Sequence, residues 1–170
     1  MCSTLYKYNY SLRKYLERYF YKIIMSLYIA RTLEKNDYNK NYLPLLKQLT
    51  TIEPDKITRD MFNAFVDNLT DKHLIYVIEE PNLHIIIGTI TLLIETKLIH
   101  NMGLVGHIED VVVDSNFRGL GLSKLLVNKA VEVAKNYGCY KVILDCNNTN
   151  KPVYEKCGFT NNGNQMSLYL

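Results

Sequence analysis

Apolar and polar positions follow two different periods along this chain, and each period predicts a different kind of element. Runs of β-branched and aromatic residues predict strands, as in HIIIGTITLLIE at 84–95. Apolar residues spaced three and four apart predict amphipathic helices, as between Met61 and Leu69. The predicted strands cover 26–33, 73–80, 84–95, 107–114, 140–146 and 165–170, and the predicted helices cover 58–69, 120–137, 151–156 and a stretch that follows Asp37 and ends near Thr50, with a loop at 96–106.

The order of these elements predicts an α/β domain with one mixed sheet. Pro81 and Asn82 separate two strands that form an antiparallel hairpin. A helix separates the strands at 107–114 and 140–146, which is the order of a parallel βαβ crossover. The chain of 170 residues has the length of one domain and contains no internal repeat. We therefore expect a mostly antiparallel sheet flanked by helices, with a central βαβ unit, over residues 26–170.

Residues 1–25 are predicted to form a basic extension that precedes this domain. Five cations oppose Glu17 there, which gives the segment a net charge of +4, and apolar residues recur at helical spacing between Leu12 and Ile24. A basic amphipathic helix suits a membrane surface or a partner, so peripheral membrane contact through residues 1–24 is one interpretation. The interpretation that we favour is a simple appendage, or an upstream start that precedes Met25.

Charge and cysteine usage exclude several classes of protein. The whole chain carries +3, so the part after residue 25 has a charge of about −1 and lacks the excess of cations that nucleic acid binding requires; we expect no nucleic acid partner. The four cysteines form no CxxC pair, which favours a reducing cytoplasm over a disulfide scaffold. No apolar window of 18 residues predicts a membrane span, and the N-terminus lacks a signal-peptide pattern.

The turn DSNFRGLGLSK carries the clearest chemical signal in the chain. Gly119 and Gly121 allow the backbone to approach an anion closely, and the helix that follows presents N–H groups at its first turn. Neither the Walker pattern GxxxxGK[ST] nor the dinucleotide pattern GxGxxG is present. A strand-to-helix turn without a ligand is the alternative interpretation.

The string R-x-x-G-x-S from Arg118 to Ser123 resembles the acyl-CoA pyrophosphate loop of the GNAT-type acetyltransferases, [QR]-x-x-G-x-[GA]. A narrower resemblance, to the eukaryotic-type glucosamine 6-phosphate N-acetyltransferases, runs from about Met25 to the C-terminus. It implies the GNAT fold and direct acetyl transfer, in a ternary complex, from acetyl-CoA to the amine of glucosamine 6-phosphate on the route to UDP-N-acetylglucosamine. The matching strings are GHIEDVVVDSNFRGLGLSKLL at 106–126, NYGCYKVILDC at 136–146 and YEKCGF at 154–159, with weaker similarity in LKQLT at 46–50 and ETKLIH at 95–100.

The resemblance implies a site for the acetyl donor. Helix N-terminal amides, Arg118 and Lys124 would hold the pyrophosphate, and the main chain of 110–113 would pair with the pantetheine arm as an added strand. One strand N–H, such as that of Val111, would face the thioester oxygen. The implied donor-binding residues are Asp110, Val111, Val112, Val113, Arg118, Gly119, Leu120, Gly121, Leu122, Ser123, Lys124, Asn150 and Tyr154.

The resemblance also implies which residues bind the acceptor and move protons. Tyr154, in the motif N-x-x-x-Y, would protonate the leaving thiolate. Glu109 and Asp110 would bind the protonated amine and accept its proton, although adjacent strand residues face opposite sides, so we expect at most one of the two side chains at the site. The implied acceptor-binding residues are Thr50, Lys97, His100, Glu109, Asp110, Asp145, Cys146 and Tyr169, and the implied catalytic residues are Tyr154, Glu109, Asp110 and Asp145.

Tyr169 stands where the family has an arginine. A phenol lacks the charged fork of arginine, so we expect weaker phosphate binding or a compensating cation elsewhere. The family forms a homodimer in which the C-terminal strand crosses to the partner, and the apolar strand at 165–170 fits such an exchange.

The sequence suggests two other chemistries and two other functions. Cys146 and Cys157 have no base at a suggestive spacing, which favours direct transfer over an acyl-enzyme. His107 and Glu109 have the spacing of a zinc deaminase, but the required P-C-x-x-C is absent, so we expect no metal. The alternative functions are a GNAT-type enzyme for another small amine, suggested by Tyr169, and a non-catalytic acyl-CoA-binding protein, suggested by the basic extension.

Overall fold

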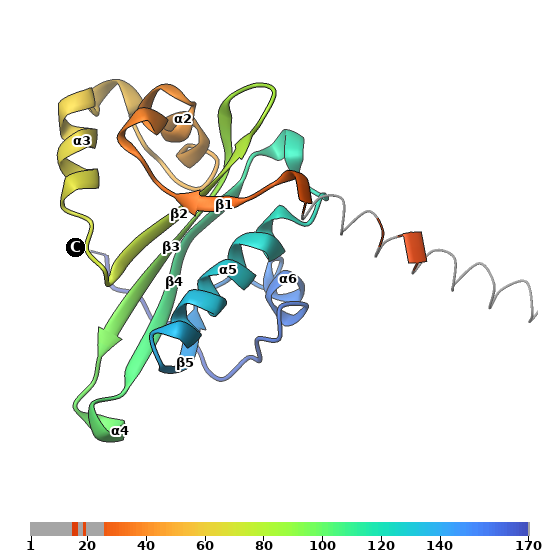
Figure 1. Ribbon diagram of the computed structural model, residues 1–170. Helices are drawn as coiled ribbons and strands as arrows, with labels where there is room; N and C mark the ends of the chain where they lie inside the picture. Colours follow the sequence, from red (N-terminus) through yellow and green to blue (C-terminus); the bar gives the residue numbers. More distant parts are fainter. Residues whose placement is uncertain (1–14, 17–18, 20–25, 170) are drawn as a thin grey trace, which may run out of the picture.

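Figure 1 shows the computed structural model of the chain, which describes residues 15, 16, 19 and 26–169. Most of the predicted basic extension at 1–25 lies outside the described residues. Five strands form one sheet, with short helices and turns between them. The strands are β1 Ala30–Thr32, β2 His73–Glu80, β3 Ile85–Thr96, β4 Leu104–Val113 and β5 Cys139–Leu144; the helices are α2 Tyr42–Leu46, α3 Arg59–Asp67, α4 Ile99–Met102, α5 Leu122–Asn136 and α6 Lys151–Glu155; and the 3-10 turns are η1 Lys35–Asn39, η2 Pro54–Lys56 and η3 Ser115–Phe117.

The sheet has the predicted mixed topology. Its strand order is β1-β2-β3-β4-β5, and neighbours are antiparallel from β1 to β4. β4 and β5 are parallel, and α5 makes the crossover between them. The predicted fold class, an α/β domain with a central βαβ unit, is therefore confirmed.

Helices cover both faces of this sheet and bury a separate core on each (Figure 1). α5 packs on one face, where Ile90, Leu92 and Ile108 of the sheet meet Leu126 and Ala130 of the helix. α2 and α3 pack on the other, where Val77, Ile86 and Val112 meet aromatic and leucine side chains. β4 contributes to both cores and therefore lies between the two helical layers.

The predicted helix between Asp37 and Thr50 is broken into two pieces. η1 ends at Asn39, and Asn41 has a positive φ of 63°, which interrupts the helical path before α2 begins. Pro44 falls in the first turn of α2, where its missing N–H costs no hydrogen bond. The break leaves residues 47–50 as a turn after α2.

The predicted loop at 96–106 is shorter in the structure than in the prediction. β4 already begins at Leu104, and α4 closes the turn between β3 and β4. His100, Asn101 and Met102 all have positive φ, so this tip is held in an uncommon backbone conformation.

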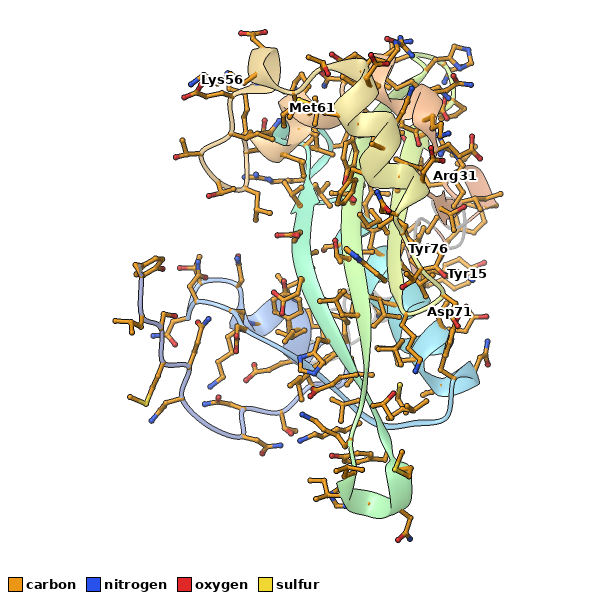
Figure 2. All side chains as sticks on the ribbon, turned by 90° about the vertical axis from the view of Figure 1, so that its left-hand side faces the viewer. Tyr15, Arg31, Lys56, Met61, Asp71 and Tyr76 are labelled. Carbon is orange, nitrogen blue, oxygen red and sulfur yellow. The ribbon has the colours of Figure 1, made fainter. Side chains whose placement is uncertain are left out.

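The strand predicted at 165–170 is wrong for a single chain. Residues 159–169 form no helix or strand, and Met166, Leu168 and Tyr169 are 95%, 85% and 93% exposed. Figure 2 shows this segment standing apart from the sheet. A strand is defined by the ladder that it makes with a neighbour, and the described part of this chain offers it none.

A charged network fastens the short strand β1 to its neighbours. Asp37 is fully buried, and Arg31, labelled in Figure 2, donates to both of its carboxylate oxygens at 2.8 and 2.7 Å. Arg31 and Lys40 also donate to Glu79 of β2, at 2.7 and 2.8 Å. These hydrogen bonds, that from Lys40 first, lower the pKa of Glu79 from 4.5 to about 2.

Replacing this carboxylate, Glu79→Gln, should make the free energy of unfolding less sensitive to acid. Because the folded pKa lies below the ordinary value, Glu79 contributes stability above pH 4.5 that is lost as the pH falls toward 2. Urea unfolding at neutral pH and at about pH 3 should show that the free energy of unfolding falls more in the wild type than in the variant. Equal losses in both proteins would contradict this assignment.

Candidate active site

A β-bulge in the central strand β4 shapes the middle of the molecule. Where β3 has the single residue Ile90, β4 has two, Asp110 and Val111. Asp110 has a positive φ of 51°, which is uncommon for a residue with a side chain. Such a backbone persists only where the surrounding structure enforces it, and it is frequent at functional sites.

β4 and β5 separate just before this bulge. Their pairing runs from Leu104 with Cys139 to Ile108 with Leu144 and ends there. Within the described residues, the main chain of 109–113 therefore has no strand neighbour on the β5 side. An open strand edge can pair with an extended ligand, so the predicted donor-binding main chain of 110–113 lies where it could do so. We call this divergence of β4 and β5 the fork.

The loop after β4 has the conformation that an anion site needs. Gly119 and Gly121 have φ of 80° and 84°, a region that residues with a Cβ enter at a cost. α5 begins at Leu122, and no side chain of the described residues caps it, so its first N–H groups can point at a ligand. Arg118 Nε donates to the carbonyl of Val113 at 3.1 Å and closes the base of the loop.

The predicted donor residues differ in what they can offer to a ligand. Val112 and Leu122 are buried in the two cores, so they can contribute only main-chain groups. Leu120 is exposed at the tip of the loop, and Ser123 and Lys124 lie in the first turn of α5. Positive charge and the helix dipole therefore favour an anion at the same place.

Three carboxylates gather on the acceptor side of the fork. Burial raises the pKa of Glu109, and the charges of Asp110 and Asp145 raise it further, while His107 opposes them. The like charges reach one another because β4 and β5 are neighbours up to the fork. Glu109 thus holds a proton more strongly than an ordinary glutamate does.

The bulge changes which way these side chains point. Ile108 and Val111 both pack on the α5 core, although an unbroken strand would send residues three apart to opposite faces. Asp110 affects Tyr42 on the other face, where burial first, and then the charge of Asp110, raises the tyrosine pKa to about 12. The strict alternation predicted for Glu109 and Asp110 is therefore wrong, because the bulge adds a residue between Ile108 and Val112.

Tyr154 lies in α6, beyond the carboxyl end of β5. Its ring is half-buried and meets Phe159 at 6.3 Å between centroids. Burial raises the pKa of its phenol, with smaller contributions from Cys146 and Cys157, so the hydroxyl remains protonated at neutral pH. The charge of Lys124 in turn reaches Cys157 and opposes the rise that burial causes in that thiol's pKa. These interactions bring α6 and the first turn of α5 together at the fork.

The other predicted positions lie around the same strand ends. Asn150 is the residue before α6, one turn ahead of Tyr154, and its N–H donates to Asn147 Oδ1 at 2.9 Å. Asp145 and Cys146 follow the last residue of β5 directly and are exposed. Sequence and structure thus agree that these residues share one end of the sheet.

The residues predicted to bind the acceptor phosphate do not come together in one chain. Lys97 and His100 lie at the α4 end of the sheet, where Lys97 pairs with Glu95 and His100 contacts Tyr140 at 4.4 Å between ring centroids. Thr50 follows α2, which lies at the opposite end of the molecule from α4 (Figure 1). Tyr169 is exposed in the C-terminal segment. A single described chain therefore holds parts of this predicted site in separate places.

Two residues at the site were missed by the sequence analysis. Tyr42 is buried on the α2 side, hydrogen-bonds Thr89 and feels the charge of Asp110. His107, weighed only as a metal ligand, pairs with Glu95 at 2.8 Å and partly offsets the charges around Glu109. Tyr42 is one of 14 tyrosines, and no motif distinguishes it.

Two further features bear on the class of the protein. Among the residues that the structure describes, no group of three or more histidine, cysteine, aspartate and glutamate side chains could hold a metal ion. In the same part of the chain, no helix has the length and apolar character needed to cross a membrane.

Comparison with known proteins matches this geometry to a family. The model of the acetyltransferase (GNAT) family matches residues 33–159. The chain is 45% identical over 143 residues to glucosamine 6-phosphate N-acetyltransferase of Arabidopsis thaliana, covering 82% of this chain and 95% of the relative. The corresponding protein of Candida albicans is 39% identical over 142 residues, covering 82% and 93%.

A solved structure supports the same assignment. The crystal structure of the Arabidopsis thaliana protein superposes with a TM-score of 0.80 at 44% identity and covers 84% of this chain and 97% of that one. The family match spans β2 to β5, the fork, the glycine loop and α6. This chain belongs to the GNAT family of acetyltransferases.

Proposed function

We propose that this protein transfers an acetyl group from acetyl-CoA to the amine of glucosamine 6-phosphate, giving N-acetylglucosamine 6-phosphate and CoA. GNAT acetyltransferases use acetyl-CoA, and relatives at up to 45% identity are named for this acceptor. The observation that carries the proposal is the fork, where an open strand edge, the first turn of α5 and three carboxylates meet.

The donor side of the fork fits acetyl-CoA, which would supply the acetyl group as a thioester. The open edge of 109–113 offers main-chain groups to an extended arm. Gly119 and Gly121 keep the loop backbone clear, and the first turn of α5 offers N–H groups and the positive end of a 15-residue helix to a pyrophosphate. Arg118 and Lys124 add positive charge beside it.

The acceptor side can bind an amine and take its proton. A protonated amine is attracted by Glu109, Asp110 and Asp145, whose mutual repulsion it relieves. The raised pKa makes Glu109 a stronger base than an ordinary carboxylate, which suits proton removal before attack. The N–H groups on the open edge of β4, that of Val111 among them, are candidates to stabilise negative charge on the carbonyl oxygen.

Tyr154 supplies the proton at the other end of the reaction. Its phenol is kept protonated by burial, and it lies near the first turn of α5, where the donor would be held. A neutral hydroxyl can donate to a departing thiolate without placing a new charge in the site. Direct transfer then requires no covalent intermediate on Cys146 or Cys157.

We propose that the acceptor site is completed by a second copy of the chain. Met166, Leu168 and Tyr169 are almost fully exposed, as expected of a strand that pairs with a partner. Packing of a second copy against the first could also bring together Thr50, Lys97, His100 and Tyr169, which lie apart in one chain. Tyr169, in place of an arginine, supports a second candidate function, acetylation of a different small amine.

We also propose a cytoplasmic enzyme of UDP-N-acetylglucosamine biosynthesis. The thiols of Cys139, Cys146 and Cys157 are free, as a reducing compartment requires. Subcellular fractionation tests the location, and recovery of the activity in a particulate fraction would count against it.

Purified protein with acetyl-CoA should release CoA when glucosamine 6-phosphate is the acceptor and much less when glucosamine is. A panel of amines, followed by the release of free thiol, measures this preference. Faster turnover with another amine would support the second candidate, and binding of CoA without turnover on any amine would indicate a non-catalytic acyl-CoA-binding protein.

Tyr154→Phe should lower kcat by about 100-fold while the affinity for CoA stays close to that of the wild type, because the phenol acts only on the leaving group. Steady-state kinetics and calorimetric titration with CoA give the two quantities. Tyr15→Phe, which changes an exposed tyrosine ahead of the sheet, is the matched control. A kcat that is the same in the wild type and Tyr154→Phe would remove Tyr154 from the mechanism.

Leu168→Glu should convert a dimer into monomers, because the charge would be buried in the exchanged strand. Sedimentation velocity should give about twice the chain mass of 19.8 kDa for the wild type and the single mass for the variant. Activity should fall together with the dimer fraction. A wild type that sediments as a fully active monomer would contradict the exchange.

A further inference from the structure

Gln48 connects the turn after α2 to the start of the donor loop. Its Nε2 donates to Asp114 Oδ2 at 2.8 Å, and its Oε1 accepts from the N–H of Ser115 at 2.8 Å. The two partners are adjacent residues at the exact point where β4 ends and the loop begins. One side-chain amide therefore bridges segments that are 66 residues apart along the chain.

Asp114 is the residue from which the loop starts. It is only 6% exposed, and its Oδ1 accepts from the N–H of Asn116 at 2.9 Å while its carbonyl accepts from Phe117. These two bonds shape η3, the turn that leads to Arg118. Neither of them attaches the loop to another part of the molecule.

The two hydrogen bonds to Gln48 attach the start of the donor loop to the turn after α2. Beyond Asp114, the side-chain hydrogen bond of Arg118 leads back to Val113, in the same segment. Gly119 and Gly121 have no side chains with which to hold a position, and their backbone is intrinsically permissive. The N–H of Asp114 also donates to the carbonyl of Ile87 at 2.8 Å, which ties the end of β4 to β3, and Phe117 packs on the α5 core. The two hydrogen bonds of Gln48 add the connection between the loop and the α2 layer.

We propose that Gln48 is a positioning residue for the donor loop, holding Asp114 so that the loop and the first turn of α5 are ordered before the pyrophosphate arrives. The inference rests on the proposed use of acetyl-CoA. Gln48 touches neither the donor nor the reacting atoms; it acts through Asp114. An ordered loop binds its ligand more tightly because less conformational entropy is lost on binding.

The chemistry of the two partners explains why an amide serves here. The carboxylate of Asp114 can only accept, and the N–H of Ser115 can only donate. The side chain between them must therefore carry one donor and one acceptor, which glutamine provides. Loss of this hydrogen-bond donor leaves the buried carboxylate of Asp114 short of a partner, which costs free energy.

Gln48→Met keeps the length of the side chain and removes both hydrogen bonds. The KM for acetyl-CoA and the dissociation constant of CoA should each rise about tenfold, while kcat at saturating donor stays within about twofold, because the bound donor itself orders the loop. Asn68→Met is the matched control: it removes an amide hydrogen bond of 2.8 Å within the end of α3. It should change neither constant by more than about twofold.

A double variant that exchanges the carboxylate and the amide distinguishes a positioning role from a general loss of stability. Gln48→Glu alone places two carboxylates side by side and should weaken CoA binding more than Gln48→Met does. Adding Asp114→Asn restores a donor facing the new carboxylate, while the oxygen of the new amide still accepts from Asn116. The double variant should recover CoA affinity to within about threefold of the wild type.

Calorimetric titration with CoA needs no acceptor, so it tests Gln48 even if glucosamine 6-phosphate is not the substrate. A wild type that binds CoA but fails the amine panel would remove only the proposed acceptor. Unchanged CoA affinity in Gln48→Met, a loss confined to kcat, or no recovery in the double variant would each overturn the positioning role. Thermal unfolding of every variant confirms that it is folded at the temperature of the assay.

Discussion

The separation of β4 from β5 is the constraint on which the rest of the site depends. Up to Ile108 the two strands share a parallel ladder, and after it their main chains diverge. A strand edge left open in the middle of a domain would ordinarily be a hazard, because its N–H and C=O groups lack partners. Here the bulge at Asp110 turns the chain at that point, and the open edge becomes a place where an extended ligand can complete the sheet.

The same separation of β4 and β5 places negative charge on one side of the fork and positive charge on the other. On one side, burial and the charges of Asp110 and Asp145 raise the pKa of Glu109, and the three carboxylates together attract a cationic amine. On the other, the first turn of α5 and its neighbouring cations attract a pyrophosphate. The substrates of an acetyl transfer to an amine carry the complementary charges, which is the electrostatic basis of the proposed function.

Attachment of the loop is a separate requirement. Backbone freedom at Gly119 and Gly121 allows the loop to fit an anion, but that freedom alone does not fix where the loop lies. The hydrogen bonds between Gln48 and the start of the loop connect the α2 layer to the proposed donor site, although no α2 side chain needs to contact the donor. In this proposal the two helical layers have different roles: α5 supplies the anion site, and the turn after α2 holds the start of the loop.

Much of this molecule is determined by local sequence. The strands at 73–80 and 84–95, the helix of α5 and the glycine loop were predictable because period, β-branched residues and turn glycines act over a few residues. The motif around Tyr154 could likewise be found from the chain itself, and its resemblance to a family indicated its role.

Tertiary structure alone decided the features that depend on neighbours distant in sequence. The bulge at Asp110 exists because β4 pairs with β3 on both sides of it. No pattern in VVVD predicts that β4 has one residue more than β3 at this point. Tyr42, His107 and Gln48 acquire their roles from partners 12 to 68 residues away. The strand predicted at the C-terminus has no ladder with any of the described residues, because apolar alternation fixes a strand's faces but not its partner. Local sequence sets what each segment can become, and long-range pairing sets where its side chains meet.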